Sequence, residues 1–282
     1  MPPANEQSAD PRAAATRILR WKQGELEAVD DSLAREEPLE IRVKGESVAV
    51  TMRTPGHDEE LALGFLLSEG VIAGANDLLE VAPCQQGEAA LHGNVLNVFL
   101  APGVEIDLAR LKRNVYASSS CGLCGKASIE SVHGHFEPLA KREPLITAET
   151  LLQLPTKLRS EQETFDKTGG LHAAGLFDTD GNLLTLREDV GRHNAVDKIA
   201  GYMFMHGIAG GDKIFYTTGR LTSEMVIKTV HMGIPILISR SGFTAWGVDL
   251  ARQVGLTLIG RARGKRFVAL AGENRIVYDA DP

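Results

Sequence analysis

The sequence predicts an α/β protein with two domains, and three observations lead to this prediction. The chain has 282 residues, clearly more than the ~150 residues of a typical single domain. Its first half combines a hairpin pattern with short helix patterns, which is typical of a small α+β unit. Its second half alternates strand and helix patterns, which favours a three-layer α/β domain with a largely parallel sheet covered by helices on both faces.

The N-terminal part begins with residues 1–15, which are polar, rich in Ala and Pro and without periodicity. We expect a disordered tail there. The small α+β domain follows over residues 16–117, with Asp58 as the capping residue of its first helix. Its expected elements are a hairpin over 39–52, a helix that ends at Gly70, a strand over 95–100 and an amphipathic helix over 108–114.

The C-terminal domain is expected over residues 136–282. It opens with a hairpin pattern in which two apolar runs flank a polar turn. Helices and strands then alternate, and two final strands could close an edge of the sheet. The expected elements are the hairpin over 171–186, helices over 192–206, 222–232 and 244–254, and strands over 213–217, 234–239, 256–259, 266–271 and 275–278.

Composition and charge argue against some classes of function for this chain. Hydrophobic residues make up 43% and charged residues 24% of the chain, as in ordinary globular proteins. The 30 basic and 37 acidic residues give a net charge of -7, which disfavours nucleic acid as a partner. The first residues lack the apolar core of a signal peptide, and apolar stretches such as 61–67 are too short to cross a bilayer. We therefore expect a cytoplasmic protein without a membrane partner.

Two of the three cysteines lie close together in a segment with loop composition. The segment SSSCGLCGKAS contains Cys121 and Cys124 among glycines and serines, so we expect a flexible loop over residues 118–135 between the domains. Three interpretations of this pair stay open. The cysteines could bind structural zinc together with His133 and His135, act as a redox-active dithiol, or carry sulfur as a persulfide on a mobile arm.

His172 lies in the glycine-rich sequence TGGLHAAG. Zinc deaminases carry the pattern H-x-E, followed later by P-C-x-x-C. Here Ala174 occupies the position of the general acid, and the cysteine pair precedes the histidine, so we expect neither deamination nor a catalytic zinc. His172 is either a buried histidine with satisfied hydrogen bonds or part of a ligand pocket.

The sequence EDVGRHNAVDK places Arg192 and His193 at the start of a predicted helix. Asp189 and Asp197 lie four residues before and after His193. One interpretation is capping by Asp189 together with an ion pair on the helix. The other is a site for an anion or a heterocycle at the helix start.

Two turns connect a predicted strand to a predicted helix through glycine. The first contains Gly219 and Arg220, and the second contains Arg240 and Ser241. Such turns bind phosphate through free backbone N–H groups at the carboxyl ends of strands, and the arginines would add charge-assisted bonds. We therefore expect a nucleotide to bind at these turns.

A basic stretch follows the last predicted parallel strand. It has four cations in six residues and no acidic residue, which is unusual in an acidic chain. The stretch is either a solvated edge of the sheet or a second contributor to anion binding. Its members are Arg261, Ala262, Arg263, Gly264, Lys265 and Arg266.

From Glu37 to about Tyr278 the chain resembles the FdhD family, the formate dehydrogenase accessory sulfurtransferases. The resemblance rests on the order and number of several motifs. These motifs are EPL, TP followed by ELALGF, SEG, SSSCGLCGK, TGGLHAA, EDVGRHNAVDK, GRLTSEMVIK and LTLIGRARGKR.

The resemblance implies a fold, a reaction and partners. The C-terminal domain would be similar to cytidine deaminases, and the protein would act as a homodimer. It would receive sulfur from an IscS-type cysteine desulfurase and pass it to the molybdenum cofactor, bis-molybdopterin guanine dinucleotide (bis-MGD), for formate dehydrogenase. Cys121 would carry the persulfide with Cys124 as its partner, and residues 261–266 match the family's cofactor-binding stretch.

We therefore expect a cytoplasmic sulfurtransferase with Cys121 and Cys124 as its catalytic residues. Because bis-MGD contains guanosine diphosphate (GDP) arms, we expect GDP to bind as a partial mimic. The alternative is a chaperone that binds the molybdenum cofactor without transferring sulfur. The expected cofactor-binding residues are Arg261, Ala262, Arg263, Gly264, Lys265, Arg266, His172, Arg192, His193, Gly219, Arg220 and Ser241.

Overall fold

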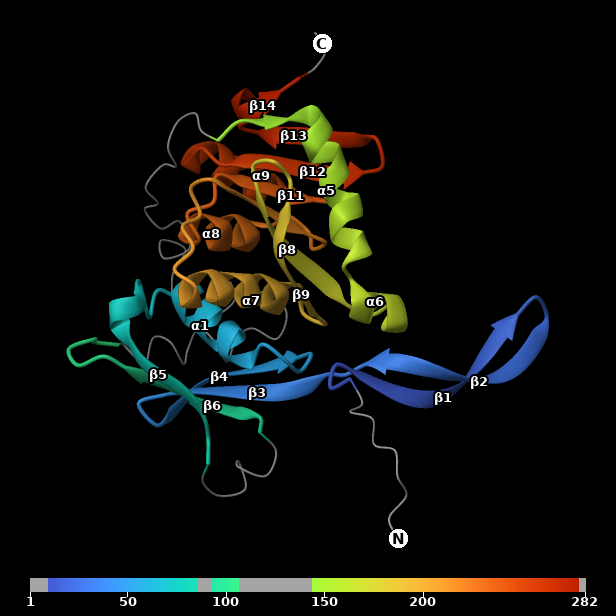
Figure 1. The fold of residues 1–282 in the computed structure, drawn as a ribbon, viewed down its shortest axis with the longest axis horizontal. Helices are drawn as coiled ribbons and strands as arrows, with labels where there is room; N and C mark the ends of the chain where they lie inside the picture. The colour runs from blue at the N-terminus through green and yellow to red at the C-terminus, as the bar shows by residue number, and fades with distance from the viewer. Residues whose placement is uncertain (1–9, 86–92, 107–143, 279–282) are drawn as a thin grey trace.

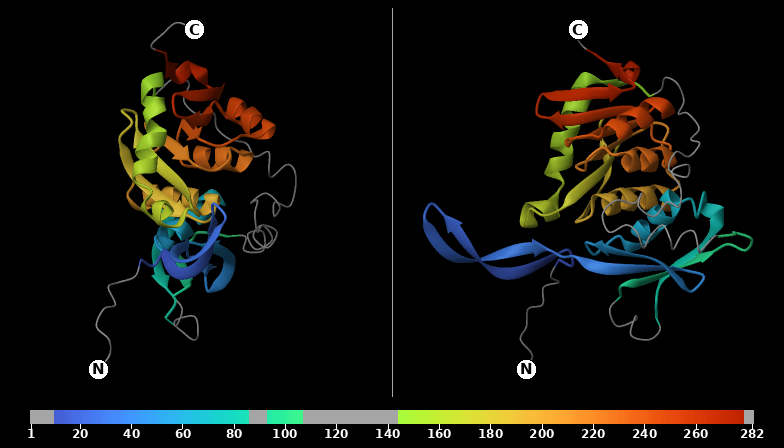
Figure 2. Two further views of the ribbon diagram at one scale, coloured as in Figure 1. Left: turned by 90° about the vertical axis from the view of Figure 1, so that its right-hand side faces the viewer. Right: turned by 180° about the vertical axis from the view of Figure 1, so that it is seen from behind.

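The computed structural model of the chain describes residues 10–85, 93–106 and 144–278. It contains a three-layer α/β domain, a smaller sheet beneath it and a long two-stranded arm (Figure 1). The far end of the arm extends sideways and stands clear of the rest of the molecule (Figure 2). Within the described ranges, no helix combines the length and the apolar character needed to cross a membrane.

The arm and the smaller sheet come from the N-terminal part of the chain. The arm is an antiparallel pair of strands, and the smaller sheet has the order β4-β3-β6-β5. Leu39, Ile41 and Val43 of β3 are fully buried in the core of this sheet. The strands are β1 (Ala13–Lys22), β2 (Glu25–Ala34), β3 (Glu37–Val43), β4 (Glu46–Arg53), β5 (Leu78–Pro83) and β6 (Val95–Leu100).

The structure confirms three of the predicted N-terminal elements and corrects others. The predicted hairpin is formed by β3 and β4, the strand predicted over 95–100 is β6, and the helix predicted before Gly70 is α1 (Asp58–Ser68). Residues 13–15 belong to β1 and not to the predicted tail. The arm is not predicted from the sequence, because most of its side chains are exposed and give no apolar pattern. The helix predicted over 108–114 and the loop predicted over 118–135 lie outside the described residues.

Helix α1 (Asp58–Ser68) lies between the smaller sheet and the α/β domain (Figure 1). Asp58 is its first residue and does not cap it as predicted, because its carboxylate binds the buried guanidinium of Arg53 at 2.9 Å. The N-cap residue is His57, in a left-handed conformation with φ 58°. The apolar side of α1 completes the core of the smaller sheet.

Helix α1 crosses helix α7 (Arg192–Met205) at very short range. A Cβ atom on Gly64 would lie 1.8 Å from the carbonyl oxygen of Asp197, and one on Gly201 would lie 1.8 Å from that of Glu60. Only glycine fits at either position. Direct backbone contact therefore fixes the smaller sheet against the α/β domain.

The α/β domain is built on a six-stranded sheet with the order β13-β12-β11-β10-β8-β9. β10, β11 and β12 are parallel, whereas β8, β9 and β13 are antiparallel to their neighbours. The sheet is therefore mixed, which corrects the prediction of a largely parallel sheet. Its strands are β8 (His172–Asp178), β9 (Leu183–Asp189), β10 (Lys213–Thr217), β11 (Ile236–Ser239), β12 (Thr257–Arg263) and β13 (Arg266–Ala271).

The final predicted strand does not close an edge of the large sheet. β14 (Ile276–Val277) pairs in parallel with β7 (Ile146–Thr147) in a separate two-stranded sheet. Short 3-10 helices, Ala75–Asp77 and Glu273–Arg275, precede β5 and β14.

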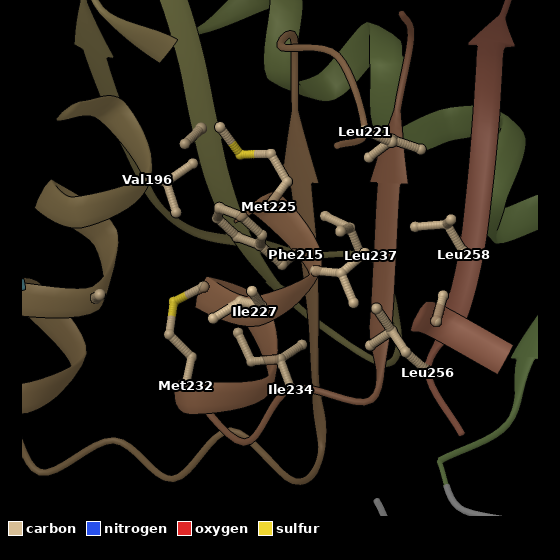
Figure 3. Packing of buried hydrophobic residues seen from close by; sticks show 14 of the residues in the cluster. Val196, Phe215, Leu221, Met225, Ile227, Met232, Ile234, Leu237, Leu256 and Leu258 are labelled. Carbon is tan, nitrogen blue, oxygen red and sulfur yellow. The ribbon is translucent and has the colours of Figure 1, made fainter. Parts of the chain in front are cut away.

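Three helices cover one face of the large sheet, as the alternating pattern predicts. They are α7, α8 (Ser223–His231) and α9 (Ala245–Val254). Figure 3 shows the core beneath them, where Met225 of α8 packs among the sheet residues Phe215 and Leu237. The apolar sides of these helices bury this face of the sheet.

The opposite face is covered by α5 (Ala148–Ser160), which continues into the short helix α6 (Glu163–Thr168). The buried leucines of α5 pack against the sheet. Neither helix is predicted from the sequence. α5 contains Pro155 in its interior, where proline removes a backbone hydrogen bond. Tertiary packing stabilises a helix that local sequence signals disfavour.

Candidate functional site

The residues predicted to bind the cofactor gather at one edge of the large sheet. The parallel strands β10, β11 and β12 end at this edge. β8 runs antiparallel to β10, so His172, its first residue, lies at the same edge. His172 pairs in register with Asp189 at the end of β9, which brings Arg192 and His193 of α7 to this edge as well.

The turn after β10 contacts both neighbouring elements. Thr218 Oγ1 lies 3.2 Å from His172 Nδ1. A Cβ atom on Gly219 would lie 3.1 Å from Arg192 Cβ, so glycine allows this turn to pack closely against the start of α7. Ser239 Oγ donates to Gly219 O at 2.6 Å and ties the turn to β11.

The backbone N–H groups of the two turns expected to bind phosphate are largely engaged within the protein. Four of these bonds run from Gly219 N to Thr217 Oγ1 (3.1 Å), from Leu221 N to Gly242 O (2.9 Å), from Ser241 N to Ser239 Oγ (2.9 Å) and from Thr244 N to Leu221 O (3.1 Å). A donor already bonded inside the protein gains little by binding an anion. An anion at this edge must therefore bind mainly through side chains.

The basic stretch begins within a strand, because β12 continues beyond its predicted end to Arg263. A bulge between Gly260 and Arg263 interrupts its pairing with β13, and Arg261 has a left-handed φ of 53°. The Arg261 guanidinium lies 5.2 Å from the centre of the Phe243 ring, which it covers. Arg263 Nε donates to the backbone oxygen of Arg240 at 2.7 Å.

Exposed cations follow one another along this end of the sheet, and Ala262 between them is buried. Gly264, with φ 57°, forms the turn from β12 to β13. No carboxylate within the described ranges forms an ion pair with any of these cations. We call this group the basic edge; its members are Arg220, Arg240, Arg261, Arg263, Lys265 and Arg266.

The surroundings of the two histidines at this edge disfavour their charged forms. Burial, reinforced by the nearby Arg192, lowers the pKa of His172. His193 Nε2 lies 3.3 Å from Glu224 Oε2, but burial and then the cations Lys228 and Arg192 outweigh this carboxylate and lower the pKa of His193 to about 3. Both imidazoles can therefore act as hydrogen-bonding groups, whereas anion binding is left to the arginines.

Asp189 is fully buried and holds the start of α7 in place. Its carboxylate accepts hydrogen bonds from Gly191 N (2.9 Å) and Asn194 Nδ2 (3.0 Å), and it pairs with Lys198 Nζ at 2.7 Å. It also accepts from the backbone N–H of Thr54 in the loop before α1 (3.1 Å). The N-cap residue of α7 is Gly191 and no side chain caps the helix, so the capping interpretation of Asp189 is wrong. Asp189 instead holds the helix start through the Gly191 N–H, and its ion-pair partner is Lys198.

The four-residue spacing suggests that Asp197 pairs with His193, but the structure gives Asp197 other partners. It pairs with Lys228 Nζ of α8 at 2.5 Å and accepts from Ser68 Oγ of α1 at 2.9 Å. Lys198, Lys228 and Glu224 are residues that the sequence analysis misses. Their partners come from other elements, so spacing within one helix gives no signal for them.

Among the described residues, no three His, Cys, Asp or Glu side chains are grouped so that they could hold a metal ion. Cys121, Cys124, His133 and His135 lie outside the described residues, so the interpretations of the cysteine pair stay predictions. The remaining cysteine, Cys84, is half-buried.

A family model described as the FdhD/NarQ family matches residues 34–277 of the chain. The chain belongs to this family. The sulfur carrier protein FdhD of Streptomyces coelicolor is 45% identical over 271 residues, which cover 94% of this chain and 95% of that protein. The sulfur carrier protein FdhD of Mycobacterium tuberculosis is also 45% identical over 271 residues, covering 93% of this chain and 98% of that protein.

A solved structure of the family shows the same fold. It is the crystal structure of a protein from Desulfotalea psychrophila described as a formate dehydrogenase accessory protein. The TM-score is 0.77 at 28% sequence identity, and the match covers 95% of this chain and the whole of that chain. The FdhD resemblance drawn from the motifs is therefore confirmed, whereas the similarity to cytidine deaminases stays a prediction.

Proposed function

We propose that this FdhD-family protein carries sulfur as a cysteine persulfide from an IscS-type cysteine desulfurase to bis-MGD and so serves formate dehydrogenase. The basic edge is the observation that carries this proposal. A chain of net charge -7 that gathers exposed cations at one end of a sheet has a local surface complementary to an anion. The diphosphate groups of bis-MGD supply such an anion. The homodimer and the cytoplasmic location belong to the same proposal.

The heterocycles of the cofactor would contact the two histidines near the basic edge. Their surroundings favour the neutral forms of the His172 and His193 imidazoles. His172 lies 3.2 Å from Thr218 in the turn that contains Gly219, and His193 follows Arg192, which packs against Gly219. Neutral imidazoles exchange hydrogen bonds with guanine or pterin groups without adding charge. The basic edge would therefore bind the phosphates, and the two histidines would orient the rings.

The sulfur chemistry would use Cys121 and Cys124. The Cys121 thiolate attacks the terminal sulfur of the desulfurase persulfide, a new S–S bond forms on Cys121, and the desulfurase thiolate leaves. For delivery, the Cys124 thiolate attacks Cys121 Sγ and hydrosulfide leaves toward the cofactor. This step leaves a Cys121–Cys124 disulfide, which an external dithiol must reduce before the next cycle.

Intact-mass measurement after incubation with a cysteine desulfurase and cysteine tests sulfur loading. We expect a gain of about 32 Da for each sulfur atom, because a thiolate that attacks a persulfide retains the terminal sulfur. Cys121→Ser should abolish the gain, and Cys84→Ser is the matched control that should retain it. A protein that gains no mass although the desulfurase is active would contradict the proposal.

The alternative function, cofactor binding without sulfur transfer, rests on the same basic edge. GDP binding alone does not distinguish the two functions, whereas the mass gain does. Replacing Arg263 and Arg266 by Ala should weaken GDP binding and leave persulfide loading intact, because the anion contacts and the thiol are separate groups. GDP bound with unchanged affinity would place the nucleotide site elsewhere.

A further inference from the structure

The far end of the arm formed by β1 and β2 stands clear of every other described element (Figures 1 and 2). The two strands pair over their whole length, from Ala13 opposite Ala34 to Lys22 opposite Glu25. Only the base of the arm packs closely against the α/β domain, at α6. A two-stranded hairpin by itself is only marginally stable in water. An arm that reaches this far therefore suits a binding element that a partner covers.

Polar contacts hold the base of the arm in a set direction. Asp10, just before β1, accepts from Arg12 Nε at 2.9 Å and pairs with Lys167 Nζ of α6 at 3.2 Å. Arg35 Nε, just after β2, donates to Ala13 O at 3.2 Å and joins the two ends of the hairpin. Because several charges share this network, it restrains the arm more than a single surface ion pair would. The arm is therefore oriented before any partner binds.

The far end of the arm has one apolar face and one charged face. Trp21 lies opposite Leu26, and these side chains are 71% and 66% exposed. Arg20 lies opposite Glu27 on the other face, because successive side chains of a strand point to opposite faces. Tryptophan is among the residue types that dominate the binding energy of protein interfaces, so the apolar face suits a protein contact. We call this face the arm patch; its members are Leu19, Trp21, Leu26 and Ala28.

The arm extends from the side of the molecule on which the basic edge lies. The red turn between β12 and β13, where Arg263 pairs with Arg266 of the basic edge, points to this side in Figure 1 and in the rear view of Figure 2. A protein that takes an anionic cofactor from the basic edge must approach from this side. The arm therefore flanks the path of such a protein.

We propose that the arm docks the protein that receives the cofactor, a formate dehydrogenase that still lacks it, with Trp21 as the main contact. This inference rests on the proposed function and adds the surface through which the two proteins bind. The position beside the basic edge favours the acceptor enzyme over a second copy of this chain. The size of the contact agrees, because the arm patch has four side chains, whereas permanent homodimers bury roughly 2,000 Å² or more. A small contact suits a partner that binds, takes up the cofactor and leaves.

Surface plasmon resonance tests the inference, with the full chain immobilised and a formate dehydrogenase purified without its cofactor as the probe. Trp21→Ser and Leu26→Ser each remove one side chain of the arm patch. Leu79→Ser is the matched control, because Leu79 is 70% exposed on β5, away from the arm (Figure 1). We expect Trp21→Ser to weaken binding about thirtyfold or more, as the loss of a dominant interface residue predicts. Leu26→Ser should weaken binding less, and Leu79→Ser should bind as wild type does.

The inference is wrong if the wild-type chain does not bind the probe, or if both arm variants bind it as tightly as wild type. It is also wrong if light scattering shows a dimeric wild type and a monomeric Trp21→Ser, because the arm would then connect two copies of this chain. Persulfide loading, measured by intact mass, separates this inference from the proposed function. Arm variants that load sulfur normally but bind the enzyme weakly support the inference, whereas a wild-type chain that loads no sulfur contradicts the proposed function. Circular dichroism of each variant verifies that it is folded.

Discussion

His193 illustrates at the scale of one residue how burial determines chemistry at the site. A carboxylate 3.3 Å from an imidazole favours protonation, but desolvation and the nearby cations Lys228 and Arg192 favour the neutral ring more strongly. A neutral ring binds through directed hydrogen bonds. His193 therefore suits recognition of a heterocycle better than recognition of phosphate.

This view of His193 predicts a specific pH dependence. The pKa in the folded protein is about 3 instead of the ordinary 6.5, so we expect the NMR signals of the His193 ring to show no titration from pH 7 down to 4.5. The unfolded state takes up a proton near pH 6.5, so His193 contributes to stability above that pH, and this contribution is lost as the pH falls toward 3. A titration midpoint near 6.5 in the folded protein would contradict the prediction; the protein in urea is the control.

Asp189 is the residue on which the position of the α7 start depends. Asp189→Asn keeps the shape of the side chain but leaves the buried ammonium of Lys198 without its counter-charge. We expect a loss of about 3–5 kcal/mol in the free energy of unfolding, measured with urea. Asp249→Asn on the exposed surface of α9 is the control and should change stability by less than about 0.5 kcal/mol. A small effect of Asp189→Asn would mean that the buried pair does not hold α7.

Some residues of the candidate site can be predicted from the sequence, and others cannot. Arg192, His193 and the cations of the basic edge stand out because their residue types and spacing indicate anion or ring binding. Lys198 and Glu224 do not stand out, because each finds its partner on a different strand or helix. The use of the turn N–H groups is also missed: Leu221 N and Thr244 N bond to the neighbouring turn, whereas Gly219 N and Ser241 N bond to hydroxyl groups two residues earlier.

Among the elements, the crossing of α1 and α7 places the strongest constraint on sequence. Gly201→Ala would gain roughly 1 kcal/mol of helix propensity, but its Cβ atom would lie 1.8 Å from Glu60 O. We expect the clash to dominate and to lower the free energy of unfolding by about 3 kcal/mol or more. Gly211→Ala is the control, because no atom lies within 4 Å of its added Cβ. Thermal denaturation that gave equal midpoints for the two variants would contradict this account of the crossing.

Elements with strong local patterns agree with their predicted bounds. β10 and β13 match the predicted strands residue for residue, and α7 begins at the predicted Arg192. α5 contradicts its local signals because of Pro155, and its stability comes from leucines packed on the sheet. The arm of β1 and β2 leaves Trp21 and Leu26 exposed as a cross-strand pair, so no buried face is present to give a pattern.

At the scale of the whole molecule, anion binding depends more on how the charges are distributed than on the net charge. The chain is acidic overall, yet the basic edge concentrates cations where three parallel strands end. The topology creates this concentration, because Arg220 and Arg240 follow β10 and β11, and Arg261 lies in the last part of β12. The family match over residues 34–277 and the related crystal structure show that this architecture is shared within the FdhD family.

The exposed position of the basic edge predicts that nucleotide binding depends on salt. We expect the affinity for GDP to fall as ionic strength rises from about 0.05 to 0.5 M, because screening shortens the reach of exposed charges. Guanosine, which lacks phosphates, is the control and should show little change. Equal salt dependence of the two ligands would argue that the cations at this edge do not bind the phosphates.

We propose that this protein moves sulfur onto an anionic cofactor. The most direct measurement follows radioactive sulfur from cysteine, through a cysteine desulfurase and this protein, to bis-MGD extracted afterwards. The account predicts that the label appears first on the protein and then on the cofactor, and that Cys121→Ser blocks both steps. A protein that binds the cofactor while the label never reaches it would contradict the account and would identify a binding protein instead.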